Sequence, residues 1–267
     1  MNKLISFVVS YPDWPRLCIL LVTMFIFWNI EMSRLSVLHY EKKRHALLNF
    51  LFVFPAAPIQ FFLGFLFVFA INWDGKNHFG LLTELPSGLN LFVKTLFTII
   101  ALDFFEYAYH VMMHKVKLFW RIHLIHHADE KLDVTTTFRE HPAETLIRLS
   151  FSLLIVFLLG VPFWIYILRQ WIQIAVNVMQ HSSIRLPKKI NRIVSLIFIT
   201  PNLHQVHHHY QLPYTDCNYG DIFSVWDRMF GTLALPEAIV LKYGIDKGIA
   251  ESKKEKFIEL LLNPFIK

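Results

Sequence analysis

The sequence predicts an all-α integral membrane protein with about four transmembrane helices, a helical hairpin among them, and a helical cap that carries histidines. Of the 267 residues, 55% are hydrophobic and only 17% are charged, whereas soluble domains have about 25% charged residues. Eleven of the 14 histidines lie between residues 110 and 209. So much apolar surface excludes intrinsic disorder. With Cys18 and Cys217 as the only cysteines, a disulfide scaffold and a thiolate zinc site are also excluded.

Four apolar stretches are expected to enter the bilayer, and they cover residues 17–30, with an extension to Ser36 left open, 46–72, 89–113 and 146–180. The first is shorter than the roughly 20 residues that a spanning helix needs. The second contains Pro55 and Pro58, which a membrane helix accommodates as a kink. The fourth is interrupted by Gly160-Val161-Pro162, which predicts a hairpin that returns to the same side. No cleavable signal sequence is recognised, so the first stretch is expected to be retained.

The distribution of lysine and arginine predicts the orientation of these spans. The basic segments are residues 31–45, 115–121 and 185–192. In contrast, residues 73–88 contain Lys76 as their only basic residue. If the N-terminus lies on the extracellular or lumenal side, all three basic segments and every histidine cluster lie in the cytoplasm. The net charge is +6, and the lysines and arginines lie between apolar runs rather than along one face. This distribution favours a membrane surface over nucleic acid as a partner. Residues 190–199 are expected to lie on that surface.

The whole chain, residues 1–267, is predicted to form a single membrane-embedded domain. Its expected parts are the first three spans (17–113), a cytosolic histidine segment (114–145), the helical hairpin (146–181) and a cytosolic cap (182–267).

Eight histidines have the spacing of residues on one helical face. They are His110 and His114, then His123, His126 and His127, then His204, His207 and His208. Imidazole is the commonest protein ligand for metals such as iron, zinc and copper. Because even an octahedral ion uses only six ligands, eight imidazoles predict two metal ions.

The third span supports this interpretation. At 100° per residue, Asp103, Glu106, His110 and His114 share a stripe about 80° wide on an otherwise apolar helix. Carboxylates inside a membrane are costly and normally have a partner. Asp103 and Glu106 are therefore expected to accept hydrogen bonds from the ligand imidazoles.

The second arm of the hairpin has a similar polar stripe, which ends at His181. We expect His181 to be a ninth ligand and Asn177, one turn earlier, to be a weak ligand or an orienting group. His141 precedes Pro142 and is expected either to cap a helix or to orient a ligand. The remaining histidines are interpreted as structural, and they are His39, His45, His78 and His209.

A nitrogen-rich site without cysteine fits redox-active iron with open positions better than structural zinc, which is closed by four ligands that usually include thiolate. A lipid would enter from the bilayer, and apolar walls would exclude water.

The chain resembles the fatty acid hydroxylase/sterol desaturase superfamily of membrane diiron enzymes over roughly residues 95–235. The matching stretches are Asp103-x-x-Glu106-Tyr107-x-x-His110-x-x-x-His114, Phe119-Trp120-Arg121-Ile122-His123-x-x-His126-His127, Thr136-x-x-Arg139-x-His141-Pro142, Gln180-His181, Thr200-Pro201-x-x-His204-x-x-His207-His208 and Asn218-Tyr219-Gly220-Asp221-x-x-x-x-Trp226-Asp227-Arg228-x-Phe230-Gly231-Thr232.

The resemblance implies a four-span helical protein whose cytosolic cap holds two iron ions, with zinc as a possible replacement in purified protein. It implies that the eight clustered histidines and His181 are the ligands. Some relatives have a further histidine where this chain has Asn177. The resemblance also implies that Asp227 and Arg228 pin the C-terminal segment under the cluster, while Gly220 is interpreted as a turn residue.

The resemblance further implies O2-dependent lipid chemistry in a bacterial inner membrane or the endoplasmic reticulum. Electrons would come from an external donor such as a cytochrome b5-like protein, a ferredoxin or a flavoprotein reductase, because the chain has no GxGxxG motif. Lipid C–H hydroxylation is the main expectation, and desaturation on the same scaffold is the alternative. A membrane metal-binding or transport protein is a third reading, although the histidines lie at one end of the third span rather than along it.

Overall fold

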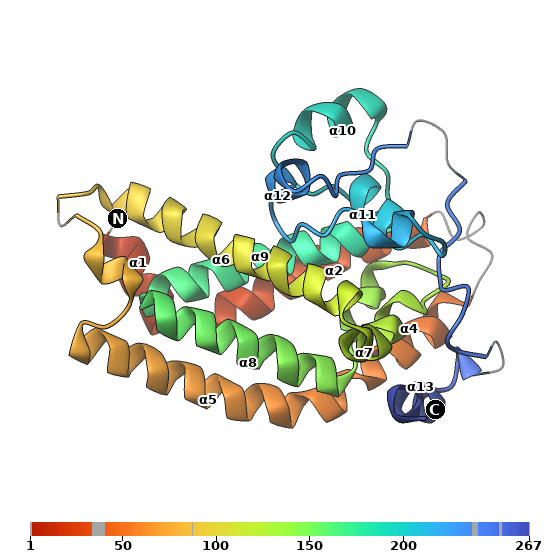
Figure 1. Ribbon diagram of the computed structural model, residues 1–267, viewed down its shortest axis with the longest axis horizontal. Helices are drawn as coiled ribbons and strands as arrows, with labels where there is room; N and C mark the ends of the chain where they lie inside the picture. Colours follow the sequence, from red (N-terminus) through yellow and green to blue (C-terminus); the bar gives the residue numbers. More distant parts are fainter. Residues whose placement is uncertain (1, 34–40, 87, 237–239, 251–252, 267) are drawn as a thin grey trace.

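The computed structural model describes residues 2–33, 41–86, 88–236, 240–250 and 253–266. Within these residues, long helices form an elongated bundle, and the shorter helices other than α1 (Asn2–Ser10) gather at one end of it (Figure 1). The long helices are α2 (Asp13–Met32), α5 (Val53–Asn77), α6 (Leu91–Lys115), α8 (Pro142–Leu159) and α9 (Phe163–His181).

The shorter helices are α1 (Asn2–Ser10), α4 (Lys42–Leu51), α7 (Lys117–His127), α10 (Lys188–Val194), α11 (Pro201–His207), α12 (Val225–Met229) and α13 (Phe257–Leu262). Single 3-10 turns are η1 (Leu81–Glu84), η2 (Val134–Phe138), η3 (Tyr214–Asp216) and η5 (Asn263–Phe265). The described residues contain isolated β-bridges but no extended strand. The predicted all-α class is therefore confirmed.

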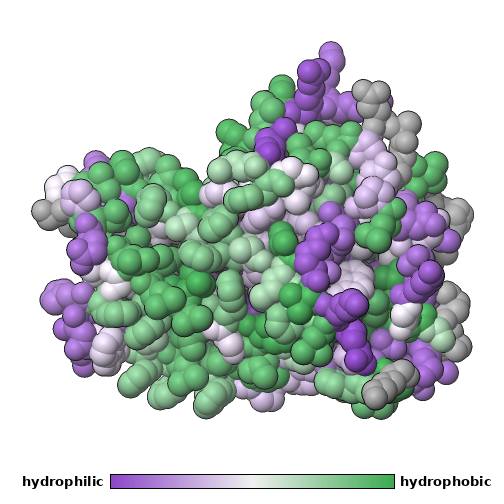
Figure 2. Space-filling view, viewed as in Figure 1, coloured by the Kyte–Doolittle hydropathy of each residue, from purple (hydrophilic) through white to green (hydrophobic). Residues whose placement is uncertain are grey.

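Three stretches are long and apolar enough to cross a membrane, namely Asp13–Met32, Lys42–Glu84 and Pro142–Leu159. The helices α6 and α9 are of similar length but carry the polar stripes noted in the sequence. Figure 2 shows apolar surface over the long helices, with polar surface at both ends of the bundle. Large side chains such as Phe61 and Phe54 are 84% and 73% exposed there. Such extensive apolar surface indicates a membrane protein, because its exposure to water would be energetically unfavourable.

The core of the bundle is formed where α8 packs against α5 and α6, and α2 packs against α9. Side chains from α5, α6, α8 and α9 interdigitate in one buried cluster that includes Phe67, Leu102, Val156 and Ile165. This packing brings the C-terminal ends of α6 and α9 to the end of the bundle where α7 and α11 lie (Figure 1).

Two predicted boundaries need correction. The first span is a full 20-residue helix, Asp13–Met32, rather than the shorter 17–30. Its first turn accommodates Pro15 because backbone N–H groups there have no helical partner. The second stretch divides into α4 and α5 close to Phe52. Pro55 follows this junction, and its missing N–H removes a hydrogen bond that would join the two helices.

The helices α8 and α9 flank the predicted turn at Gly160, which is the C-cap of α8. Gly160 has a φ of 67° in the left-handed region, where residues with a Cβ are strained. A Cβ at this position would lie 2.3 Å from the carbonyl oxygen of Phe79 and 3.0 Å from the Cα of Gly80. Two backbones therefore touch at this end of the bundle.

Replacing Gly160 with alanine is expected to destabilise the protein by at least about 2 kcal/mol, because the change adds left-handed strain to a backbone clash. Thermal unfolding in detergent measures the effect. Gly64→Ala is the matched control, since a Cβ there meets nothing within 4 Å inside α5. It should raise stability by up to about 1 kcal/mol through helix propensity. Equal effects of the two substitutions would contradict the close approach.

Candidate metal centre

The nine predicted ligand histidines converge into two groups. The group of five consists of His110, His114, His123, His127 and His207, and the group of four consists of His126, His181, His204 and His208. In each group, one possible ligand atom from every ring lies within 4.8 Å of the others. The groups adjoin, because the rings of His127 and His208 stack with centroids 4.5 Å apart.

Local helical structure prepares this convergence. His110 and His114 are one turn apart at the end of α6, and His181 is the last residue of α9. The third segment is α7, which ends at His127. The fourth is α11, whose N-cap Thr200 accepts a hydrogen bond from the backbone N–H of Leu203. Each helix thus presents its histidines on one face.

The Nδ1 atoms of six rings are held by hydrogen-bond acceptors outside the two groups. Four acceptors are backbone carbonyls, and the pairs are His110 with Tyr219 (2.9 Å), His126 with Arg139 (3.2 Å), His181 with Asn177 (2.9 Å) and His207 with Cys217 (2.7 Å). Two acceptors are carboxylates, and the pairs are His123 with Glu144 (2.6 Å) and His114 with Asp216 (3.3 Å). Because a carbonyl only accepts, Nδ1 carries the proton in the first four rings, and Nε2 is left with a lone pair.

These free Nε2 atoms face one another inside the groups. The Nε2 atoms of His126 and His181 are 3.1 Å apart, although the hydrogen bonds at Nδ1 leave neither with a proton to donate in the neutral ring. In the other group, the Nε2 atoms of His114, His123 and His207 are buried without a partner. Buried polar atoms normally have partners. Lone pairs that converge in this way fit a bound cation, so the residues present fit a metal centre.

Burial keeps the imidazoles neutral, as metal ligands must be. Desolvation lowers the pKa of His123 to about 4, and desolvation together with the neighbouring His123 lowers the pKa of His126 to about 3. The same two causes, burial and nearby imidazoles, hold the pKa of His127 and His204 well below the usual range.

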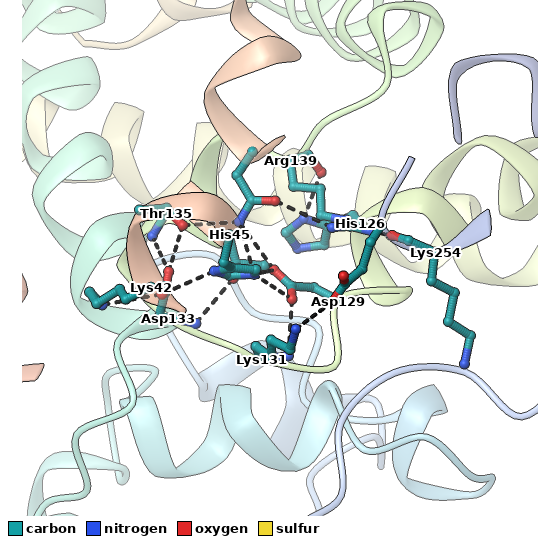
Figure 3. A network of polar contacts seen from close by, with 12 residues as sticks. Lys42, His45, His126, Asp129, Lys131, Asp133, Thr135, Arg139 and Lys254 are labelled. Carbon is teal, nitrogen blue, oxygen red and sulfur yellow. Dashed lines mark hydrogen bonds and ion pairs between the residues drawn. The ribbon is translucent and has the colours of Figure 1, made fainter. Parts of the chain in front are cut away.

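A buried polar network lies behind His126 (Figure 3). The Nε2 of His45 lies 2.8 Å from the Asp129 carboxylate, and Nη1 of Arg139 donates to the side chain of Asn49 at 3.3 Å. Burial by itself would raise the pKa of Asp129, but His45 and Arg139 together hold it well below its usual range. The network stabilises the segment whose Arg139 carbonyl positions His126.

Asp103 and Glu106 have different partners from the predicted imidazoles. The Asp103 carboxylate accepts from the backbone N–H of Ile222 (2.9 Å) and from the indole N–H of Trp226 (2.8 Å). Glu106 lies 3.8 Å from Nη1 of Arg169. Both carboxylates share the predicted face of α6, but the segments that contact them are residues 221–226 and α9. The prediction that they orient ligand imidazoles is therefore wrong.

Three other predicted supporting residues each make a hydrogen bond that includes a backbone group. His141 is the N-cap of α8, where its Nδ1 accepts from the N–H of Ala143 at 3.1 Å, so its role is capping. Asn177 orients His181 with its carbonyl oxygen rather than its side chain. The Asp227 carboxylate accepts from the N–H of Tyr219 (2.8 Å) and Gly220 (2.9 Å). It therefore holds the turn whose Tyr219 carbonyl orients His110.

Gly220 also fits the turn interpretation, since a Cβ there would lie 2.4 Å from the carbonyl oxygen of Phe223. Arg228 donates to the carbonyl oxygen of Ser195 at 2.8 Å. Among the histidines interpreted as structural, His78 forms the C-cap of α5 and His209 lies beside Gln211. His39 lies outside the described residues.

Sequence reasoning missed Glu144 and Asp216, the carboxylates that contact candidate ligand imidazoles in the described part of the chain. Glu144 is in the first turn of α8, and Asp216 is in η3. Neither residue belongs to a histidine motif. The only local signal was Glu144 three residues after His141, which sequence reasoning would assign to helix capping.

A cavity of about 470 Å³ connects the bundle interior with both histidine groups. His110 and His123 from the group of five line it, as do His126, His181 and His204 from the group of four. The other walls come mainly from α2, α5, α6, α8 and α9, together with Thr137 and Phe138 of η2. Its volume lies in the usual range for small-ligand sites, about 300–1,000 Å³.

Membrane-crossing helices and a buried, histidine-lined cavity define a membrane protein with a candidate metal centre. The profile of the fatty acid hydroxylase family matches residues 95–232, which is more than half of the chain and includes all nine histidines. The chain belongs to the fatty acid hydroxylase family.

Curated relatives include an ornithine lipid hydroxylase from Rhizobium tropici, which is 28% identical over 61% of this chain and 47% of its own length. An alkylglycerol monooxygenase from Xenopus tropicalis is 30% identical over 55% of this chain and 32% of its own length. A cholesterol 25-hydroxylase from Mus musculus is 27% identical over 58% of this chain and 53% of its own length. The chain thus spans about half or less of the length of these relatives. No solved structure matches the chain.

Proposed function

We propose that this protein is a membrane lipid hydroxylase that inserts one oxygen atom of O2 into a C–H bond. The observation that carries the proposal is the division of nine imidazoles, seven of them buried and two half-buried, into adjoining groups of five and four. Two neighbouring nitrogen-rich sites suit two iron ions. The names of the three relatives, which specify an ornithine lipid, an alkylglycerol and cholesterol, support a lipid substrate.

In this proposal the nine histidines are the metal ligands, and the Nδ1 partners of six of them hold those rings with Nε2 free to bind metal. Bound iron supplies the redox chemistry that activates O2, while the protein contributes positioning and exclusion of water. Glu144 and Asp216 increase the basicity of His123 and His114, as carboxylates do for metal-bound imidazoles. Zinc in purified protein would occupy the same ligands without redox activity.

The reaction consumes a C–H bond, O2, two electrons and two protons, and it yields an alcohol and water. The electrons come from an external donor, either a cytochrome b5-like protein, a ferredoxin or a flavoprotein reductase. We also propose that residues 114–145 and 182–267 face the cytoplasm of a bacterial inner membrane or endoplasmic reticulum, where such donors are available. The exposed apolar side chains Ile190, Ile193 and Phe198 support contact of this part with the membrane surface.

Lipid analysis of cells with and without the protein, grown under isotopically labelled O2, tests the proposal. The expected product is one oxygen atom heavier than its precursor and carries the label. A product that has lost two hydrogen atoms and gained no label would instead identify a desaturase on the same scaffold. Metal flux in proteoliposomes without O2 consumption would overturn both in favour of a transport protein.

A further inference from the structure

Two aromatic residues other than histidine contact candidate ligand rings within the described part of the chain, and they are Trp120 and Tyr219. Both contact only rings of the group of five. The centroid of the Trp120 indole lies 4.9 Å from that of His114 and 5.4 Å from that of His127. Tyr219 is fully buried. Trp120 is only half-buried, so it connects candidate ligand rings with the surface.

The place of Trp120 follows from the helix α7, which ends at His127. Trp120 precedes His123 by three residues and His127 by seven, so all three side chains share one side of the helix. An electron that reaches the indole from outside is therefore one ring contact away from two candidate ligands. Because electron tunnelling weakens steeply with distance, this bridge favours electron entry beside α7.

The surface at the start of α7 is basic. From residue 107 to residue 128 the sequence contains no aspartate or glutamate, but it contains Lys115, Lys117 and Arg121. All three are exposed. Lys115 forms an ion pair with Asp216 at 2.5 Å. Among the described residues, no carboxylate lies within ion-pair distance of Lys117 or Arg121, so both keep an uncompensated positive charge.

The segments beside this surface do not reverse its charge. Residues 245–249 pack against α7 and contribute one exposed acid, Asp246, and one exposed base, Lys247. The guanidinium of Arg121 donates to the carbonyl oxygen of Ile266 at 3.0 Å, and this neutral acceptor leaves the positive charge in place. In the view of Figure 2, hydrophilic side chains cover part of α7.

The same surface offers apolar contact as well as charge. Val116 and Leu118 lie between the cations and are 42% and 62% exposed. Complementary charges speed the association of two proteins and orient them, and apolar contacts add affinity. An anionic membrane surface would attract the same cations, but it would carry no electrons. The contact of Trp120 with two candidate ligand rings therefore favours a redox protein as the occupant.

We propose that an acidic one-electron carrier protein docks on the surface of residues 115–121, and that its electrons enter the group of five through Trp120. The inference rests on the proposed hydroxylase function and names the docking site of its electron donor. At each encounter the reduced carrier loses one electron and one bound ferric ion gains it, while no bond forms or breaks. Two encounters supply the two electrons that one hydroxylation consumes.

Binding of an acidic plant-type ferredoxin tests the docking step. The ferredoxin is kept oxidised, and its affinity for the metal-loaded protein is measured by titration calorimetry at low salt. Nanodiscs of phosphatidylcholine, which has no net charge, hold the protein. Lys117→Glu together with Arg121→Gln removes three units of positive charge, while glutamine can still donate to the Ile266 carbonyl. This variant is expected to bind at least about tenfold more weakly, and added salt should weaken wild-type binding.

Lys188→Glu together with Lys189→Gln is the matched control, because it makes the same change of charge at exposed positions of α10. It should bind ferredoxin as the wild type does. Equal affinities of the wild type and the α7 variant would overturn the docking site, and so would a wild type that does not bind ferredoxin. If the α7 variant lost only its retention of phosphatidylglycerol, the surface would be a lipid site and the proposal would fail.

Trp120→Leu separates electron transfer from docking. Reoxidation of reduced ferredoxin is followed by its visible absorption, without O2 and at saturating ferredoxin. The substitution is expected to slow this step by about tenfold, or about 1.4 kcal/mol in activation free energy, with unchanged ferredoxin affinity. Trp120→Phe keeps an aromatic ring and should retain most of the rate. Dithionite, which needs no docking surface, should reduce both variants as it reduces the wild type.

A rate unchanged in Trp120→Leu would contradict the assigned route, provided that metal content per chain equals that of the wild type. Ferredoxin binding and reduction of the protein without any oxygenated lipid would count against the proposed function alone. Oxygenated lipid formed at the wild-type rate by the α7 variant with ferredoxin as donor would count against this inference alone.

Discussion

Replacing one histidine in either group with alanine is expected to abolish the lipid product and to remove bound metal. His126→Ala takes a ligand from the group of four, and His207→Ala takes one from the group of five. Loss of a supporting partner of a metal ligand already costs about 10–100-fold in metal affinity or activity, so loss of the ligand itself should cost more than about 100-fold. Lipid analysis and metal content per chain are the measurements.

His78→Asn is the matched control, since His78 is an exposed histidine at the C-cap of α5 with a φ of 50°. Asparagine tolerates that left-handed conformation. The control should retain both product and metal. A His126→Ala protein that still changed the lipids as the wild type does would contradict the ligand assignment. Two metal ions per chain in the wild type and one in each variant would support two separate sites.

Lowering the pH below about 6.5 is expected to release metal and to destabilise the fold steeply. The pKa of His123 is lowered by burial to about 4, and that of His126 to about 3. An unfolded histidine titrates near 6.5. Between these values the unfolded chain binds more protons than the folded chain, so stability falls as pH falls. Above 6.5 neither state is protonated, and no such loss is expected.

Each such imidazole contributes about 1.4 kcal/mol of lost stability per pH unit within that window. Six such imidazoles lie on α7, on α11 or directly after α11, and they are His123, His126, His127, His204, His207 and His208. A slope of several kcal/mol per pH unit is thus expected for metal-free protein. Thermal unfolding in detergent from about pH 7.5 to 4.5, with metal content measured in parallel for the holoprotein, tests this expectation.

His126→Gln provides the comparison, because it removes one titrating ring. It should reduce the slope of stability against pH by up to about 1.4 kcal/mol per pH unit, the contribution of one proton. His78→Asn should leave the slope unchanged, since His78 is exposed. A metal-free protein whose stability stayed flat from pH 6.5 to 4.5 would show that these imidazoles are not buried as neutral rings.

The helices and the identity of the clustered histidines could be predicted from the sequence because both depend on local periodicity. The polar stripe of α9 pointed to His181, and Gly160 marked the hairpin turn. The limits of the same reasoning appear at Asp103 and Glu106. Both carboxylates share the histidine face of α6, but the periodicity of a helix does not predict which distant segment will pack against that face.

The sequence by itself predicted nine candidate ligand imidazoles and, from their number, two metal ions. Only the tertiary structure decided how the nine divide, which acceptors hold the Nδ1 atoms of six of them, and which carboxylates line the cavity. The physical reason is that a ring and its partner come from segments far apart in the chain, as with His110 and the Tyr219 carbonyl. Their meeting depends on the packing of α5, α6, α8 and α9, which no local pattern specifies.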